Sequence, residues 1–195
     1  MKGVINIQVS NDKLARANAV LARMQRAYPL AVARAANRAM YEMRPAAIEA
    51  ATERYFVKSS DIRKTITFRK ATSGNLIGTM VSRGRRRSLK NYMLTPSRPT
   101  KGAKTEVQAA VKREGGLKSL PRAFLVKRSG GKYFAFYRES YDPGNRQRKG
   151  IRSYISPSIP QILKNEEVSN IITERAIDKF NERLDHEIWY LLGQI

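Results

Sequence analysis

Helical sequence patterns lie toward both ends of the chain, and the region between them has the patterns of short strands. This order of segments constrains the fold most. Residues 14–56 are rich in Ala, Arg, Met and Leu, which are strong helix formers. From Val168 to Ile188 apolar residues recur every four positions, with acids outside that stripe, as in an amphipathic helix over 168–192. We therefore predict an α+β fold, in which N-terminal Ala-rich helices and a long C-terminal amphipathic helix pack on an antiparallel β-sheet with long basic loops.

Two prolines interrupt the N-terminal helical pattern. Tyr28 precedes Pro29 and is therefore disfavoured in helical backbone, so we expect two helices separated at that point. The pattern stays helical on both sides of Pro45, which predicts a kink or a short break there. Ahead of the helices, residues 4–9 alternate apolar and polar side chains, and this alternation predicts a short strand.

The middle of the chain carries the signals of hairpins. Residues 59–64 resemble a capped helical turn, and residues 65–69 and 76–81 are strand-like segments joined by a turn. The clearest hairpin signal is a Ser-Gly-Gly-Lys turn between residues 124–127 and 133–137. These segments predict the antiparallel pairs of the sheet.

Two basic segments in the middle show neither helical nor strand periodicity. Residues 83–104 contain an Arg85-Arg86-Arg87 run and two prolines, and residues 142–152 form a second such segment. We predict long exposed loops there, which in a compact domain usually have a function. A chain of 195 residues suits one domain. We predict a single domain over residues 1–195, with an N-terminal strand and helices (1–56), a basic sheet region containing both loops (57–152) and a C-terminal helical region (157–192).

The charge of the chain is sorted by position. The formal net charge is +22, and residues 58–104 hold 13 Lys and Arg against a single acid, Asp61. Residues 112–152 hold 12 against three, whereas residues 161–195 hold seven acids against four bases. A basic concentration of this kind suits a polyanion such as nucleic acid. The acidic end also allows a second copy of the chain to bind by charge complementarity.

The candidate DNA-facing residues lie in and beside the first basic segment. No compact helical reading module is evident, so we expect contact with phosphates, independent of base sequence. The alternative is a basic loop without a specific partner. The aromatic residues at 133–137 suit either base stacking or, as we favour, packing in the core. The DNA-facing candidates are Arg83, Arg85, Arg86, Arg87, Lys90, Lys101 and Lys104.

The sequence is poor in the residues that catalysis and metal binding need. It has no cysteine and one histidine, His186, so thiolate zinc sites, cysteine nucleophiles and multi-histidine metal sites are excluded. Asp185 and Glu187 flank that histidine, but neighbouring helical residues diverge, and we interpret the three as a solvated helix face. There is no glycine-rich nucleotide-binding motif and no apolar run long enough to span a bilayer. We expect no enzymatic activity, no catalytic residue, no cofactor, no metal and no membrane partner.

Short motifs follow one another along the chain in a specific order. They are Asn37-Arg38-Ala39, Tyr55 with Val57-Lys58, Asp61-Ile62-Arg63-Lys64, Arg69-Lys70-Ala71-Thr72 with Asn75-Leu76, Leu120-Pro121-Arg122-Ala123-Phe124, Pro157-Ser158-Ile159-Pro160-Gln161 and Leu184-Asp185-His186-Glu187-Ile188. In this order they resemble the minor tail protein Z family of tailed bacteriophages, over residues 31–192. The chain departs from the family pattern at Pro45, at Ser156 and in the long basic insert at 83–104.

The resemblance implies a tail completion protein of a siphophage or prophage, which acts at the head-proximal end of the tail and supports head–tail joining. Related proteins are α+β and form rings, commonly hexamers, so the implied partners are further copies of the chain, tail terminator or tail tube proteins and head–tail connector proteins. The implied location is the neck of the virion, and the host cytoplasm during assembly. A ring at the neck surrounds the DNA path, which basic loops would face.

The segment ahead of the C-terminal helix is the candidate assembly contact. Two prolines restrict its backbone, so we expect a rigid, structured segment. Its matching position in the family suggests contact with a partner, and a purely local structural role is an equal alternative. The candidates are Pro157, Ser158, Pro160 and Gln161.

Two other functions remain open at this point. The chief alternative is a free-standing nucleic-acid-binding protein that binds without sequence preference and takes no part in a particle. A basic assembly chaperone that leaves before the particle matures is the third.

Overall fold

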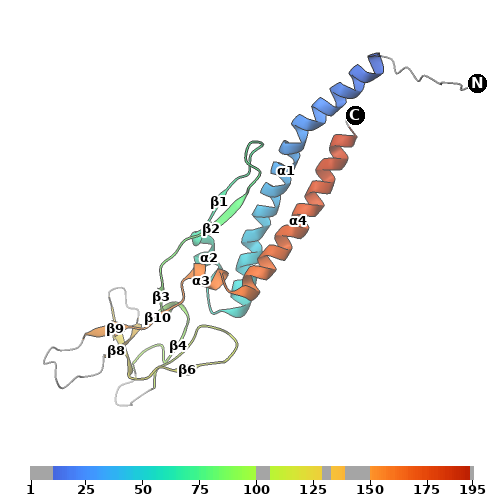
Figure 1. The fold of residues 1–195 in the computed structure, drawn as a ribbon. Coiled ribbons are helices and arrows are strands. Elements are labelled where there is room, and N and C mark those ends of the chain that lie inside the picture. The colour runs from blue at the N-terminus through green and yellow to red at the C-terminus, as the bar shows by residue number, and fades with distance from the viewer. Residues whose placement is uncertain (1–10, 100–105, 129–132, 139–149, 194–195) are drawn as a thin grey trace, which may run out of the picture. The chain divides into compact units, whose positions relative to one another are not determined.

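A computed structural model describes residues 11–99, 106–128, 133–138 and 150–193 (Figure 1). The strand predicted at residues 4–9 and the candidates Lys101 and Lys104 lie outside these residues. The helices are α1 (Asn11–Arg54), α2 (Ser59–Thr65), the 3-10 helix η1 (Leu89–Asn91), α3 (Ile159–Leu163) and α4 (Glu166–Leu192). The strands are β1 (Ile66–Arg69), β2 (Thr79–Ser82), β3 (Arg87–Ser88), β4 (Met93–Thr95), β5 (Gln108–Ala110), β6 (Lys118–Ser119), β7 (Ala123–Lys127), β8 (Tyr133–Arg138), β9 (Ile151–Ser153) and β10 (Ile155–Ser156).

The fold is mixed α+β, as predicted, with the long helix α1 packed with the long helix α4. The strands form several small antiparallel sheets instead of one larger sheet. Within the described residues the orders are β1-β2, β10-β3, β4-β5-β6 and β7-β8-β9. The predicted hairpin of residues 124–127 and 133–137 is confirmed, because β7 pairs with β8 from Ala123↔Tyr137 to Lys127↔Tyr133.

Helix α1 is continuous for 44 residues, and the predicted separation into two helices at Pro29 is wrong. A proline inside a helix removes one hydrogen bond and costs about 3 kcal/mol. Alanines that follow it, such as Ala31 and Ala35, are buried, so close packing of this face offsets the loss. The helical hydrogen bonding also continues past Pro45, where the sequence predicted a kink or a short break.

The chain divides into two compact units. Unit 1 comprises Met1–Glu42, Phe68–Met80 and Glu174–Ile195, and unit 2 comprises Met43–Thr67 and Val81–Thr173. The single-domain organisation stays a prediction. In unit 1 the Asn37 amide binds both backbone groups of Ala71, accepting from its N–H at 2.8 Å and donating to its carbonyl at 2.9 Å. This pair of bonds fixes the segment after β1 against α1.

Unit 2 holds the largest fully buried side chains of the described chain, Ile62, Ile159, Ile162 and Val168. Ile62 comes from α2 and the other three come from α3 and α4. The short helices α2 and α3 therefore contribute large apolar side chains to one core, and α2 and α3 pack on each other.

The first basic segment is not the structureless loop that the sequence predicted. Residues 87–95 carry β3, η1 and β4. Leu89 and Tyr92 are buried, so two apolar anchors among the basic residues tie the segment to the core of unit 2. Strand β3 pairs with β10, and the Ser156 hydroxyl donates to the Arg87 carbonyl at 2.9 Å. Residues 151–153, which fall in the second predicted loop, form β9, while residues 142–149 lie outside the described residues.

The predicted C-terminal helix is confirmed as α4, but its apolar stripe is not buried along its whole length. Val168 and Ile172 are buried, whereas Ile188 is exposed. Glu187, predicted on a solvated face, is buried, while Asp185 and His186 are exposed as predicted. The Glu187 carboxylate lies 3.5 Å from the guanidinium groups of both Arg34 and Arg183, which compensate its burial.

Candidate functional site

The described DNA-facing candidates fall into two groups within unit 2. Arg83, Arg85 and Arg86 are exposed in the connection between β2 and β3. The backbone N–H of Arg83 donates to the Thr65 carbonyl at 2.9 Å, so this connection is fixed at its start. Arg87 and Lys90 are only half-exposed, and both line a cavity.

Arg87 has a partner within the protein. Its Nη2 donates to Oδ2 of Asp61 at 2.7 Å, and both side chains are partly buried. Asp61 lies in the first turn of α2 and Arg87 lies in β3, so the ion pair joins two elements of unit 2. A partly buried, hydrogen-bonded pair of this kind orients both groups. The Arg87 charge is therefore compensated, whereas Arg83, Arg85 and Arg86 remain exposed.

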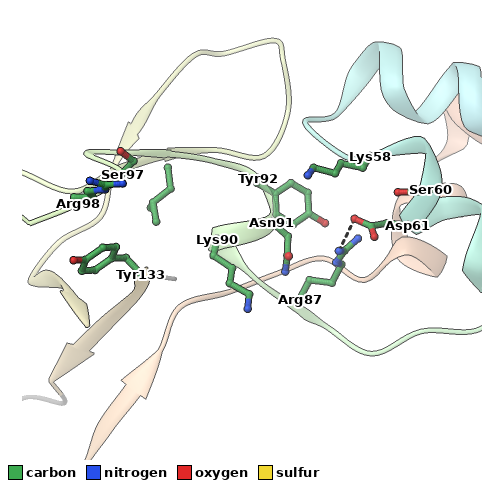
Figure 2. Close-up of a pocket in the computed structure, with 11 residues that line it drawn as sticks. Lys58, Ser60, Asp61, Arg87, Lys90, Asn91, Tyr92, Ser97, Arg98 and Tyr133 are labelled. Carbon is green, nitrogen blue, oxygen red and sulfur yellow. Dashed lines mark hydrogen bonds and ion pairs between the residues drawn. The ribbon is translucent and has the colours of Figure 1, made fainter. Parts of the chain in front are cut away.

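The cavity beside this pair has a volume of about 670 Å³ and a mostly polar and basic lining. Figure 2 shows the Arg87–Asp61 pair at one end of it and Arg98 with Tyr133 at the other. The lining comes from the start of α2, from β3 to β4, from the residues that follow β4, and from the start of β8. The lining residues are Lys58, Ser60, Asp61, Arg87, Lys90, Asn91, Tyr92, Leu94, Ser97, Arg98 and Tyr133.

Three cations of this lining have no carboxylate partner among the described residues: Lys58, Lys90 and Arg98. Among the described lining residues the only acid is Asp61, and Arg87 already binds it. The cavity therefore carries an excess of positive charge. Like charges gathered in this way attract anions and are stabilised when an anion binds.

Packing fixes two of the lining side chains. The Lys90 ammonium lies 4.0 Å from the centre of the Phe134 ring, a cation–π contact that holds the side chain but leaves its charge uncompensated. The buried Tyr92 hydroxyl donates to the Pro157 carbonyl at 2.9 Å. Burial raises the pKa of the Tyr92 phenol above its ordinary value of 10.0, so Tyr92 is a neutral donor at neutral pH.

The aromatic residues of β8 are half-buried, and they contact other aromatic rings. Phe134 and Phe136 have ring centres 6.4 Å apart, and Phe124 on β7 lies 6.4 Å from Phe136. Tyr137 packs against Tyr154 at 4.8 Å. These contacts agree with the packing role that the sequence favoured over base stacking. Tyr133 differs, because it lines the cavity.

The assembly-contact candidates form the N-terminus of α3. The Ser158 side chain accepts from the Gln161 N–H, and the Gln161 side chain accepts from the Ser158 N–H at 2.9 Å, which is a capping box. Pro160 occupies an early helical position, where no N–H is needed. Ser158 is buried, whereas Pro157 and Gln161 are exposed. The segment is structured, as predicted, and the capping box gives it the local role that the sequence left open. Its rigidity and its contact with a partner stay predictions.

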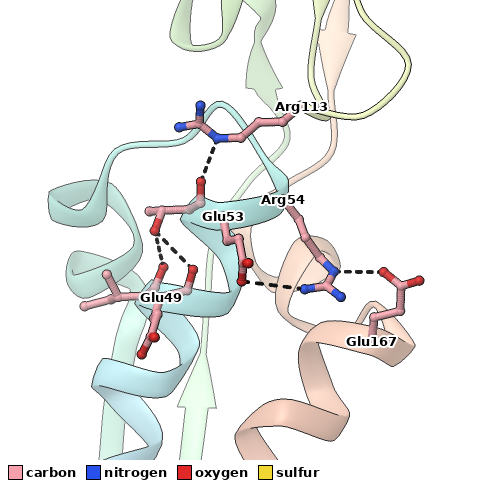
Figure 3. Close-up of polar contacts among 7 residues, drawn as sticks. Glu49, Glu53, Arg54, Arg113 and Glu167 are labelled. Atoms are coloured by element: carbon pink, nitrogen blue, oxygen red, sulfur yellow. Dashed lines mark hydrogen bonds and ion pairs between the residues drawn. The ribbon is translucent and has the colours of Figure 1, made fainter.

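A second polar cluster surrounds the C-terminal end of α1 in unit 2 (Figure 3). Arg113 donates from Nε to the Thr52 carbonyl at 2.9 Å and from its backbone N–H to the Arg54 carbonyl at 2.8 Å. It therefore satisfies two carbonyls that a helix end leaves free. The Arg54 guanidinium donates to Glu167 at 2.9 Å, and this bond holds the pKa of the Glu167 carboxyl below its ordinary value. The Arg54 charge of this cluster is paired with Glu53 and Glu167.

Neither a metal site nor a membrane span is found within the described residues. No group of three or more His, Asp or Glu side chains lies in a metal-binding arrangement in that part of the chain. None of the helices found there is both long enough and apolar enough to cross a membrane.

The sequence missed part of the cavity. Lys58, Arg98 and Tyr133 were not among the candidate site residues, although the first two belong to the basic block. Lys58 lies about thirty residues before Lys90 in the sequence, and the Arg87–Asp61 pair joins the segments that carry them. The packing of η1 on β8 brings Tyr133 to the same cavity. A signal existed in Asp61, which is the single acid among thirteen bases and therefore a candidate for an internal ion pair.

Comparisons with protein-family models, with curated proteins and with solved structures find no match to this chain.

Proposed function

We propose that this chain is a structural virion protein, a tail completion or neck protein of a tailed bacteriophage or prophage. In this role it caps the head-proximal end of the tail as a ring of identical copies, supports head–tail joining and contacts the DNA path. The proposal rests on the ordered motifs that resemble the minor tail protein Z family. It is supported by the contacts that residues of several of these motifs make in the fold.

The observation that carries the proposal is that residues of these motifs make contacts that hold the fold together. Asn37, from the first motif, binds both backbone groups of Ala71, from a motif more than thirty residues away. Asp61, from another motif, binds Arg87, and Ser158 and Gln161 form the cap of α3. Motif residues that hold the fold together are expected in a shared fold.

The charge distribution supports contact with DNA. Arg83, Arg85 and Arg86 are exposed, and unpaired cations line the cavity of the same unit. Contacts with phosphates through such residues are independent of base sequence and sensitive to salt. This property also suits the alternative, a free-standing nucleic-acid-binding protein.

The test is mass-spectrometric quantification of the chain in purified mature virions of the phage or induced prophage that encodes it, relative to the portal protein. We expect a fixed ratio equivalent to one ring per particle. Absence from mature virions, combined with DNA binding by the free protein, would replace the proposal with the free-standing nucleic-acid-binding protein. Presence only in immature particles would indicate an assembly chaperone.

A further inference from the structure

We infer that the cavity of unit 2 is a binding site for the backbone phosphates of nucleic acid, with Lys58, Lys90 and Arg98 as the phosphate-binding side chains. The inference specifies which residues make the DNA contact of the proposed function. It rests on the proposed function only for the identity of the nucleic-acid strand that is bound. It moves the principal contact from the exposed arginines at 83–86 to a site formed by residues far apart in the sequence.

The charge balance of the cavity is the first argument. Lys58, Lys90 and Arg98 have no carboxylate partner among the described residues, and Arg87 binds Asp61, the only acid among the described lining residues. The Arg87–Asp61 bond is short, at 2.7 Å, and it leaves Asp61 unavailable to neutralise the lysines. A dianion or a run of phosphodiesters supplies the missing negative charge.

The form of the lining is the second argument. Figure 2 shows Lys58 and Lys90 on opposite sides of Tyr92, with Arg98 farther along the same cavity. Hydroxyl and amide donors from Ser60, Asn91 and Ser97 accompany them. Cationic side chains mixed with small hydroxyl and amide donors are the usual set that contacts phosphate oxygens in nucleic-acid complexes.

The size of the cavity is the third argument. Its volume of about 670 Å³ lies in the range of roughly 300–1,000 Å³ typical of small-molecule sites, well above what a single phosphate ion fills. The cations are also distributed along the cavity instead of converging on one point, as Figure 2 shows. This distribution fits successive phosphates of one strand better than one isolated anion.

The test is a salt titration of binding between the full chain and a fluorescein-labelled DNA duplex, followed by fluorescence anisotropy. The cavity variant carries Lys58→Gln, Lys90→Gln and Arg98→Gln. Because each neutralised phosphate contributes about 0.9 to the slope of log K against log salt, we expect the slope to fall by roughly 2–3. A matched control carries Lys118→Gln, Lys127→Gln and Lys164→Gln, which removes the same charge from exposed positions outside the cavity. Its slope should fall by less than about 1.

A second variant guards against misfolding. Lys90 packs on Phe134, so its replacement can disturb the local structure, whereas Lys58 and Arg98 are exposed. The pair Lys58→Gln and Arg98→Gln should lower the slope by about 2 with an unchanged circular dichroism spectrum. Equal slopes for the cavity variants and the control variant would overturn the inference.

A competition experiment distinguishes two ligands, the backbone phosphates of nucleic acid and free inorganic phosphate. Inorganic phosphate is added to the wild-type complex at constant ionic strength, with chloride as the reference anion. We expect little displacement, because a single ion replaces only one of several backbone contacts. Displacement at millimolar inorganic phosphate would identify the free ion as the ligand and overturn the assignment to nucleic acid.

The outcomes for the cavity and for the proposed function are distinguishable. Binding slopes are measured on the isolated chain, whereas copy number is measured in virions. A chain present in virions whose variants show equal slopes would lose only the cavity inference. A clear slope difference in a chain absent from virions would overturn only the tail function.

Discussion

The two compact units differ in the large side chains that they bury. Among the described residues both units bury alanines, but unit 2 also fully encloses the large side chains Ile62, Ile159, Ile162 and Val168. The buried hydrophobic residues of unit 1 are Ala31, Ala33, Ala35, Ala39 and Ala71 with Met40, and ten large hydrophobic residues in its described part are exposed. These are Met24, Tyr28, Leu30, Tyr41, Leu76, Ile77, Ile177, Ile188, Trp189 and Tyr190.

This difference indicates how each unit is stabilised. A buried CH₂ or CH₃ group contributes about 0.8 kcal/mol, so an alanine contributes far less than an isoleucine. Alanine does permit close approach of α1 and its neighbours, which favours tight packing and polar links such as Asn37 to Ala71. We therefore expect unit 2 to supply most of the free energy of unfolding, and unit 1 to depend on close geometry.

The largest effect should come from truncating the core of unit 2. Ile162→Ala removes a side chain that is 1% exposed and leaves a cavity, so we expect a loss of about 2–5 kcal/mol in urea unfolding. Ile177→Ala in unit 1 is the control, because Ile177 is exposed, and it should change stability by less than about 0.5 kcal/mol. Equal losses would mean that the two units do not differ in the way described.

The opposite substitution tests the small-residue core of unit 1. Ala35→Leu inserts a large side chain at a position with no exposed surface, and overpacking of this kind costs about 1–3 kcal/mol. Ala22→Leu makes the same change at an exposed position of the same helix and should be nearly neutral. Thermal unfolding of both variants is the measurement. A more stable Ala35→Leu variant would show that unit 1 has unfilled space.

The start of α3 tests whether unit 2 also depends on local hydrogen bonds. Ser158→Ala removes the side chain that accepts from the Gln161 N–H, and loss of such a cap costs about 1 kcal/mol. Ser59→Ala is the control, because α2 has no side-chain cap and Ser59 is exposed. If both variants unfold at the same urea concentration as the wild type, the cap contributes nothing to the stability of unit 2.

Elements with a strong local signal were predictable from the sequence. The Ser-Gly-Gly-Lys sequence predicted the β7–β8 hairpin, and the apolar stripe of every fourth residue predicted α4, because both patterns depend on neighbours in the chain. The continuation of α1 through Pro29 was not predictable from local sequence preference. The burial of alanines on the following turns overrides the preference of a proline to end a helix. The cavity was missed for a related reason. Lys58 and Lys90 line one cavity because the Asp61–Arg87 pair joins their segments, and no local pattern encodes that pair.

Lowering the pH should weaken one exposed ion pair in each unit. Arg54 holds the pKa of Glu167 in unit 2 below its ordinary value of 4.5, and Lys179 does the same to Glu182 in unit 1. A lowered carboxyl pKa stabilises the folded state above pH 4.5, and this contribution is lost as the pH falls through the folded-state value. The destabilising effect of Glu167→Gln or Glu182→Gln, measured by urea unfolding, should therefore shrink from pH 7 to pH 3.

Glu166→Gln is the control for the pH series. Glu166 is exposed beside Glu167 and has no ion pair among the described residues. This substitution removes a neighbouring carboxyl group and leaves the Arg54–Glu167 pair intact. A pH dependence confined to unit 2 would mean that the Lys179–Glu182 pair does not form in solution, and the two units would then also differ in their electrostatics.

The smallest effect should come from the most exposed large residue of unit 1. Trp189 is 73% exposed, so Trp189→Ser should change the free energy of unfolding of the isolated chain by less than about 0.5 kcal/mol. Trp189 is also the only tryptophan, and its fluorescence should already show the emission of a solvated indole before unfolding. Met40→Ser, at a buried position of the same unit, is the contrast and should be clearly destabilising. A loss above about 1 kcal/mol for Trp189→Ser would mean that this side chain is part of a core, because solvated residues seldom cost that much. The contrast between an alanine core with large residues outside and an isoleucine core would then fail.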